Sequence, residues 1–316
     1  MDARSATRIP VTAVAILTLL CFIWGANVVA IKVSIQGVPP LLTAGLRSAV
    51  AACLLAAYCL VRGYKVLVPR AKLHHAAIIG TLFALDFLLL YWGNLYTHAS
   101  RAVIFLYTQP FWTALGAHFL LRDDRLSLAK GSGLAIAFIG LVPVYLSQSP
   151  SLGELHWIGD LMIVGAAFFW AATTLYVKKM GGVMDINHYQ CLFAQLFFSV
   201  PILLVASFFL EAGRPLHLTT PVVLSLVFQC IIVAFFSYLL WFWLIQAYQV
   251  SKLAAYTFLA PIFGVMLSGL LLSEGTPALL WAGLALVAAG IYLVNRPEDT
   301  AVRADQATGP GSEGLV

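Results

Sequence analysis

Charged side chains are scarce in this chain. They make up 10% of its 316 residues, whereas a soluble domain usually carries roughly a quarter. Hydrophobic residues make up 61%, and the mean hydropathy is +0.93. A chain this apolar folds stably only if most of its surface lies in lipid. The scarcity of charge therefore excludes an ordinary soluble protein and indicates a membrane protein.

Motifs of metal and nucleotide chemistry are also missing. None of the five cysteines belongs to a CxxC or Cys/His pattern, and all five fall inside apolar runs. They predict neither a metal site nor a disulfide framework. No G-x-x-x-x-G-K-[ST] loop is present, which speaks against ATP hydrolysis. The runs hold one central Asp without a His beside it, so we expect no catalytic centre and no cofactor.

Long apolar runs are abundant instead. A membrane-spanning helix needs about 20 mainly apolar residues, and ten such runs follow one another. They predict an all-α polytopic membrane protein with ten transmembrane helices. The runs lie near residues 11–31, 41–61, 75–97, 99–121, 130–147, 158–179, 187–209, 221–246, 251–272 and 278–294.

Positive charge is distributed unevenly over the loops between these runs. Fourteen of the eighteen Lys and Arg fall with one set of alternate loops, three with the other set, and Arg47 within a run. Positive residues favour the cytoplasmic side. We therefore expect a bacterial inner-membrane protein with both termini in the cytoplasm. Insertion explains the basic balance, so no nucleic-acid partner is needed.

Two sequence patterns occur twice, in the same order. FIWGANVVAIK (22–32) and FFWAATTLYVK (168–178) share Phe, Trp, Ala and Lys at an offset of 146. SRAVIFLYTQP (100–110) and SKLAAYTFLAP (251–261) share a Ser, a basic residue and a Pro at an offset of 151. A five-helix unit is therefore duplicated. Because five is odd, the second copy enters the membrane from the opposite side, which is typical of secondary transporters.

A glycine pattern supports the same division. Gly133 and Gly140 match Gly283 and Gly290 at an offset of 150. The predicted organisation is a cytoplasmic N-terminal segment 1–10, a first repeat 11–147, an extracytoplasmic linker 148–157, a second repeat 158–294 and a disordered cytoplasmic tail 295–316.

The ten helices, the duplicated units, the FxWG or FxWA helix that opens each half and the S(R/K)…P pattern resemble the drug/metabolite transporter superfamily, EamA type. The resemblance covers about 11–294 and is greatest to exporters of aromatic amino acids. It implies a central cavity and alternating access without ATP hydrolysis. The fold is also similar to that of nucleotide-sugar and triose-phosphate translocators.

Polar and aromatic residues at helical spacing are candidates for the wall of such a cavity. Trp24 and Asn27 lie three apart and share a helix face, as do their counterparts in the second half. Helix packing explains this pattern equally well, with Gly25 letting a neighbouring helix come close. The candidate substrate-binding residues are Trp24, Asn27, Tyr91, Asn94, Tyr107, Trp170, Thr174, Tyr238 and Trp241.

One acid and one base lie deep within the runs. Asp86 and Arg47 differ in depth by roughly 5 Å if both helices rise 1.5 Å per residue. A buried charge in lipid is costly, so a structural Arg47–Asp86 pair is the favoured interpretation, and proton coupling through Asp86 is the alternative. Pro110 and Pro261, at equivalent positions of the two halves, predict kinked helices.

These patterns predict a secondary transporter that exports amino acids, aromatic or large neutral, or related metabolites. Export of drug-like or nucleoside-type metabolites is the alternative. A sugar-phosphate or nucleotide-sugar translocator is a weaker one, because only Arg47 is a deep cation. An intramembrane enzyme or a channel fits less well, since neither a catalytic constellation nor a filter segment is found. We expect a small-molecule substrate and a monomer in the lipid bilayer.

Overall fold

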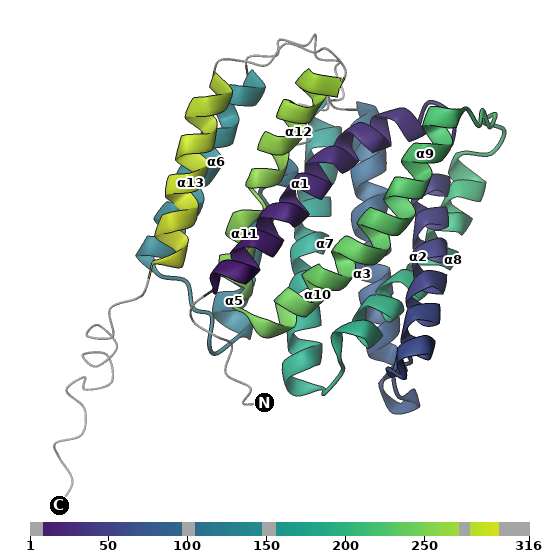
Figure 1. Cartoon of the computed structure of the whole chain (residues 1–316), viewed down its shortest axis with the longest axis horizontal. Helices are drawn as coiled ribbons and strands as arrows, with labels where there is room; N and C mark the ends of the chain where they lie inside the picture. The colour runs from purple at the N-terminus through teal and green to yellow at the C-terminus, as the bar shows by residue number, and fades with distance from the viewer. Residues whose placement is uncertain (1–8, 97–104, 147–155, 272–278, 297–316) are drawn as a thin grey trace, which may run out of the picture.

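The computed structural model describes residues 9–96, 105–146, 156–271 and 279–296 (Figure 1). Helices joined by turns and loops make up these residues, and no strand occurs among them. Most of the predicted N-terminal segment, of the linker and of the tail lies outside the described residues. The elements are α1 (Val11–Ser34), α2 (Pro40–Arg62), η1 (Arg70–Lys72), α3 (Leu73–Tyr96), α5 (Gln109–Leu120), α6 (Leu128–Leu146), α7 (His156–Val183), α8 (His188–Leu210), α9 (Thr220–Phe228), the π-helix η2 (Gln229–Ser237), α10 (Tyr238–Ala247), α11 (Val250–Tyr256), α12 (Leu259–Leu271) and α13 (Leu279–Asn295).

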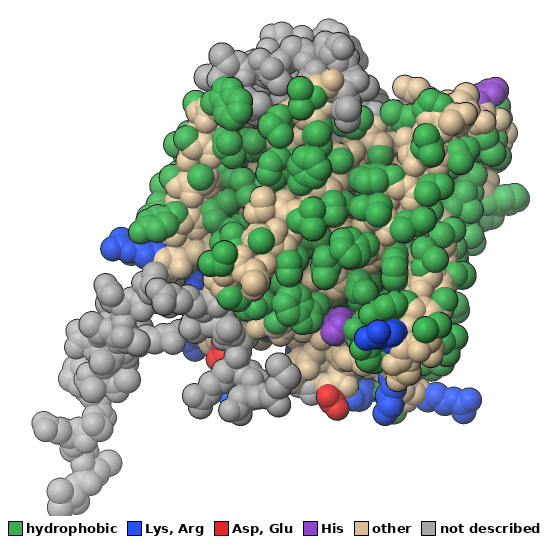
Figure 2. All heavy atoms as spheres, in the orientation of Figure 1, with side chains coloured by type: hydrophobic (Ala, Val, Ile, Leu, Met, Phe, Trp, Pro, Cys, Tyr) green, Lys and Arg blue, Asp and Glu red, His purple; other side chains and the backbone are tan. Residues whose placement is uncertain are grey.

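Six helical segments are long and apolar enough to cross a membrane, and three further apolar helices are shorter. This confirms the all-α, multi-pass class, while ten separate spans stay a prediction. Figure 2 shows hydrophobic side chains over the sides of the bundle and Lys and Arg at its lower edge. That edge is where α1 begins and α13 ends (Figure 1). The cytoplasmic placement of this edge stays a prediction.

Helices of the first half pack on helices of the second half. α3 lies along α7, α2 along α8, α1 along α12 and α6 along α13. Lipid offers no hydrophobic drive for helix association, so close van der Waals packing must hold such pairs together. The chain therefore forms one bundle in which the two halves interleave, and the region between the halves is its centre.

Glycines allow the closest of these approaches. A Cβ atom on Gly133 of α6 would lie 2.7 Å from the carbonyl oxygen of Gly290 on α13. One on Gly140 would lie 2.9 Å from the carbonyl oxygen of Gly283. The four glycines of the repeated pattern thus lie in the α6–α13 contact (Figure 1), where each glycine of α6 meets the counterpart of the other one.

The prolines expected to kink two helices instead begin new ones. Pro110 lies in the first turn of α5, and α12 begins two residues before Pro261. Thr108 and Thr257 lie just before these starts, and each hydroxyl donates to the carbonyl three residues earlier, at 2.6 and 2.7 Å. A hydroxyl bond of this kind competes with the helical ladder. The structure therefore shows a short turn just before each proline, and kinks at the prolines themselves stay a prediction.

Candidate functional site

A cavity lies where α1, α3, α7, α8 and the η2–α10 segment meet. It contains about 830 Å³ of empty space, its open mouth included. Both halves of the chain contribute to its wall. The lining residues are Trp24, Asn27, Phe83, Asp86, Phe87, Leu90, Leu106, Trp170, Thr173, Thr174, Val177, Gln195, Val233, Tyr238, Trp241, Phe242 and Ile245.

Three tryptophans form the aromatic part of this wall. The ring of Trp24 lies edge-on to Trp170 at 6.3 Å and to Trp241 at 5.2 Å. Trp24 and Trp170 are the tryptophans that match between the two halves of the sequence. Edge-to-face rings of this kind stabilise one another beyond their buried area. The duplicated motif thus forms a single cluster rather than two separate ones.

The position of Trp24 is fixed by the π-helical segment opposite. Its indole Nε1 donates to Ser237 Oγ at 3.0 Å, and that hydroxyl donates to the carbonyl of Val233 at 2.6 Å. Ser237 ends η2, and π-helical turns are frequent at functional sites because they change the direction of the side chains that follow. The bond orients the indole in the cavity wall.

Gly25 explains why the same stretch of α1 also serves packing. A Cβ atom at this position would lie 2.7 Å from the Gly264 nitrogen and 2.8 Å from the Phe263 Cβ, both on α12. One face of α1 therefore packs closely on α12 while Trp24 and Asn27 face the cavity. Residues that pack on α12 and residues that line the cavity follow one another closely in this stretch. The sequence analysis gave helix packing and a cavity wall as alternatives, and both describe it.

Three polar groups in the wall lack partners among the described residues. Asn27 Oδ1 and Gln195 Oε1 are buried oxygens without a hydrogen-bond donor. Asp86, 6% exposed, also lines the cavity and forms no hydrogen bond or ion pair with another described side chain. Buried acceptors without donors are costly, so a hydrogen-bond donor in the cavity would satisfy them. An ammonium group has this chemistry and matches the charge of a carboxylate.

Arg47 does not pair with Asp86 as the sequence predicted. The guanidinium donates instead to the hydroxyl of Tyr238, with 2.6 Å between Nη2 and the oxygen. Its Cζ lies 4.4 Å from the centre of the Phe87 ring, a cation–π distance. The expectation rested on depth alone, whereas the rotation of each helix about its axis decides which side chains meet.

Six of the nine sequence-predicted binding residues line the cavity: Trp24, Asn27, Trp170, Thr174, Tyr238 and Trp241. Tyr91 and Tyr107 are buried but are not in its wall. The side chain of Asn94 lies outside what the structure describes. Gln195 was missed, although a glutamine in the middle of an apolar run was a signal that could have found it.

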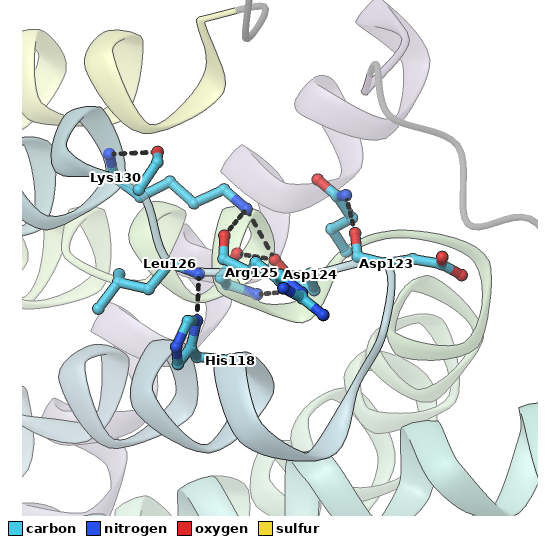
Figure 3. Close-up of polar contacts among 9 residues, drawn as sticks. His118, Asp123, Asp124, Arg125, Leu126 and Lys130 are labelled. Carbon is cyan, nitrogen blue, oxygen red and sulfur yellow. Dashed lines mark hydrogen bonds and ion pairs between the residues drawn. The ribbon is translucent and has the colours of Figure 1, made fainter. Parts of the chain in front are cut away.

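Polar contacts close the lower end of the bundle, and Figure 3 shows the main one. Asp124, in the turn after α5, is 2% exposed and forms an ion pair of 3.0 Å with Lys130. Its Oδ2 accepts the backbone N–H of Ser251 at 2.8 Å, and its Oδ1 accepts the Ser251 hydroxyl. Nearby, His118 Nδ1 accepts the N–H of Leu126 at 3.2 Å. The hydrogen bonds from Ser251 to Asp124, together called the Asp124 contact, join the first half of the chain to the start of α11 in the second half.

A second carboxylate ties the halves at the opposite end of the bundle (Figure 1). Glu211 follows α8, and its two oxygens accept the backbone N–H groups of Leu41 and Leu42 at 2.9 and 3.1 Å. Those groups begin α2, whose first N–H donors have no partner within the helix. This is the Glu211 contact. Each end of the bundle is therefore held by an acid of one half and a helix start of the other.

Comparisons with known proteins agree with this architecture. Residues 11–146 and 157–296 each match the model of the EamA-like transporter family. A Bacillus subtilis protein named "Uncharacterized transporter YvbV" is 30% identical over 91% of this chain and 93% of its own length. A Salmonella typhimurium protein named "Probable amino-acid metabolite efflux pump" is 29% identical over 87% of this chain and 92% of its own. A solved crystal structure, 17% identical, covers 93% of this chain and 98% of that one with a TM-score of 0.76, a likeness of fold alone.

Proposed function

This chain belongs to the EamA-like transporter family, as its sequence pattern predicted, and we propose that it is a secondary transporter exporting amino acids, aromatic or large neutral, or related metabolites. It is a multi-pass membrane protein of a transporter family rather than an enzyme. The substrate would occupy the cavity between the two repeats. The relative named as an amino-acid metabolite efflux pump supports both export and this substrate class.

The composition of the cavity wall is the observation that carries the proposal. Trp24, Trp170 and Trp241 offer ring surface to an apolar side chain, and Asn27, Asp86 and Gln195 offer acceptors to an ammonium group. A small polar cluster in a mainly apolar pocket is typical of sites that orient a ligand. A molecule with an aromatic or large apolar end and an ammonium end matches both parts of this wall.

Alternating access is supported by features at corresponding positions of the repeats. The turns at Thr108 and Thr257 interrupt the chain at matching places, and interrupted segments in corresponding places often mark a transporter's substrate site. The Asp124 and Glu211 contacts each join the two repeats, at opposite ends of the bundle. In our proposal, one end opens while the other stays closed, and the contact at the opening end separates.

Coupling to protons is part of the proposal, and Asp86 is its candidate group. A carboxylate in the wall that pairs with no described cation can take up a proton when the substrate ammonium leaves. Binding of a cationic group and of a proton would then exclude each other, which is the requirement for exchange of one against the other. Asp86→Asn should preserve the shape of the wall and remove this exchange.

A second candidate substrate class, drug-like organic cations, has one observation in its favour. Aromatic rings around a cation stabilise it through their π-faces, and Trp24 with Trp170 and Trp241 surrounds a cavity that also contains Asp86. An amine without a carboxylate would satisfy these residues as well. Amino acids and simple amines therefore have to be compared in the same assay.

The test is efflux from liposomes that contain the purified protein and one labelled amino acid, with and without a pH gradient. We expect efflux of phenylalanine or leucine, and a fall of about tenfold or more in Trp241→Ala, because truncating a buried Trp in a binding site usually costs at least this much. Trp243→Ala is the matched control, since Trp243 lies two residues away on α10, is 38% exposed and is outside the wall.

Each outcome of this assay decides something. Equal losses in Trp241→Ala and Trp243→Ala would remove the cavity from the proposal. A gradient effect that persists in Asp86→Asn would remove Asp86 as the coupling group. Efflux of simple amines without efflux of any amino acid would favour organic cations as the substrates.

A further inference from the structure

Arg47 is a buried cation that forms no ion pair with an acid among the described residues, although Asp86 lies within range of its charge. Its side chain is 1% exposed, and no ion pair joins it to a carboxylate among the described residues. One nitrogen donates to Tyr238, while Nε and Nη1 are buried with no hydrogen-bond acceptor. A guanidinium cannot lose its charge in a protein. Intramembrane charges of this kind usually mark functional sites.

The surroundings of Arg47 are polar as well as aromatic. Thr43, one turn earlier on α2, has a buried hydroxyl without a partner, and so does Tyr91, one turn after Phe87 on α3. Phe87 stacks on the guanidinium and lies 5.9 Å from the Tyr91 ring. Residues four apart lie on the same helix face. These groups therefore form one buried patch between α2 and α3 with donors to spare.

This patch adjoins the cavity. Phe87 and Tyr238 both contact Arg47, at 4.4 and 5.6 Å from Cζ to the ring centres, and both line the cavity. Arg47 itself is not in the cavity wall. Two aromatic rings are thus all that this wall places between the guanidinium and a ligand in the cavity, and rotation of one ring would join the two spaces.

Equivalent positions of the two repeats carry opposite chemistry here. Arg47 is the eighth residue of α2, which begins at Pro40, and Gln195 is the eighth residue of α8, which begins at His188. Each helix is the second of its repeat. Gln195 presents an unpartnered oxygen to the cavity, whereas Arg47 has unpartnered N–H donors. The repeats therefore provide an acceptor on one side and a cation on the other.

We propose that Arg47, with Thr43 and Tyr91, is the subsite for the carboxylate group of a zwitterionic substrate. The inference rests on the proposed function and narrows it to substrates with both an ammonium and a carboxylate. The carboxylate binds Nη2 together with Nε or Nη1, in the two-pronged geometry that guanidinium groups favour, after the Tyr238 hydroxyl has left Nη2. Turning aside of Tyr238 or Phe87 admits it, and the ammonium then lies toward Asp86 and Gln195.

The experiment compares L-phenylalanine with phenethylamine, which lacks only the carboxylate. Binding is measured by the fluorescence of the cavity tryptophans in purified protein, and efflux is measured in liposomes. In Arg47→Gln we expect L-phenylalanine to bind about 10–100-fold more weakly, the usual effect of losing charge-assisted hydrogen bonds, while phenethylamine changes less than about threefold. Arg47→Lys should restore part of the discrimination because it keeps the charge but not the fork.

Arg62→Gln is the matched control, since Arg62 is the exposed last residue of the same helix. It should leave both probes unchanged. A measurement on the wild type covers the case in which Arg47→Gln does not fold. In the wild-type protein, 3-phenylpropanoate, a carboxylate without an ammonium, should compete with L-phenylalanine for binding. The neutral alcohol 3-phenylpropanol should compete at least tenfold less well.

Several results would overturn the inference. Equal weakening of both probes in Arg47→Gln would assign Arg47 a structural role. No change in the binding of either probe would show that Arg47 does not contact the substrate. Equal competition by the acid and the alcohol would exclude an anion subsite without any variant. These failures leave the proposed function intact. A wild type that neither binds nor moves either probe would overturn the proposed function and this inference together.

Discussion

The contact between α6 and α13 allows a comparison of two glycines that lie two residues apart. A Cβ atom on Gly133 would meet the Gly290 carbonyl oxygen at 2.7 Å and the Val294 nitrogen at 2.9 Å. Ordinary contacts begin at 3.4 Å, and both neighbours are backbone atoms, which cannot rotate away. Gly133→Ala must therefore push α13 outward by several tenths of an ångström. Overpacking of this kind costs about 1–3 kcal/mol.

Gly131 lies on the same helix but faces open space, with no atom within 4 Å of an added Cβ. Gly131→Ala should raise stability by up to about 1 kcal/mol, because alanine favours the helix more than glycine does. The two substitutions make the same chemical change, yet we expect opposite signs. The difference isolates the helix contact from the propensity of the residue.

The assay is thermal denaturation in detergent, followed by a thiol-reactive dye. Cys21, Cys59, Cys191 and Cys230 are buried and free, so they react when the bundle opens. We expect the midpoint to fall in Gly133→Ala and to stay or rise in Gly131→Ala. A fall of the same size in both variants, or no fall in Gly133→Ala, would refute the close approach of α6 and α13.

The contacts at the two ends of the bundle give two further predictions, with the same thermal assay as readout. Glu211→Ala should lower the free energy of unfolding by about 1–3 kcal/mol because two buried N–H groups lose their acceptor. Glu211→Gln should lower it by less, and equal losses in the two variants would contradict a role of the carboxylate charge. Asp124→Ala should lower the free energy of unfolding by about 3–5 kcal/mol because it removes the carboxylate that forms the ion pair with buried Lys130. Asp123→Ala, at the exposed neighbouring position, should stay within about 0.5 kcal/mol, and a comparable loss there would count against the ion pair.

The sequence predicted what depends on composition and repetition. Scarce charge and long apolar runs indicated a membrane bundle, and matching glycines and tryptophans indicated two related halves. Those matches were informative because the repeated motifs pack on each other in the structure: Trp24 lies 6.3 Å from its match Trp170, and the repeated glycines share the α6–α13 contact. Six of the nine proposed binding residues line the cavity because aromatic and amide groups three apart on a helix share one face.

What the sequence could not predict depends on rotation and on long-range contacts. The depth of Arg47 and Asp86 along their helices follows from residue counts, but the direction in which each side chain points does not. The prolines indicated where the helices are interrupted, but the hydroxyl bonds of Thr108 and Thr257, which compete with the helical ones, were not predicted. The Glu211 contact joins residues 170 apart, which no local pattern indicates.

The differences between the repeats matter as much as their likeness. Where equivalent residues are alike, as at Trp24 and Trp170, both halves contribute the same kind of side chain to the cavity wall. Where equivalent residues differ, as at Arg47 and Gln195, the two sides of the cavity differ in their chemistry. A symmetric cavity would hold a substrate in two orientations with equal free energy. The cation of Arg47 in one half and the unpartnered oxygen of Gln195 in the other favour a single orientation, and such an asymmetry suits a substrate that carries both a carboxylate and an ammonium group.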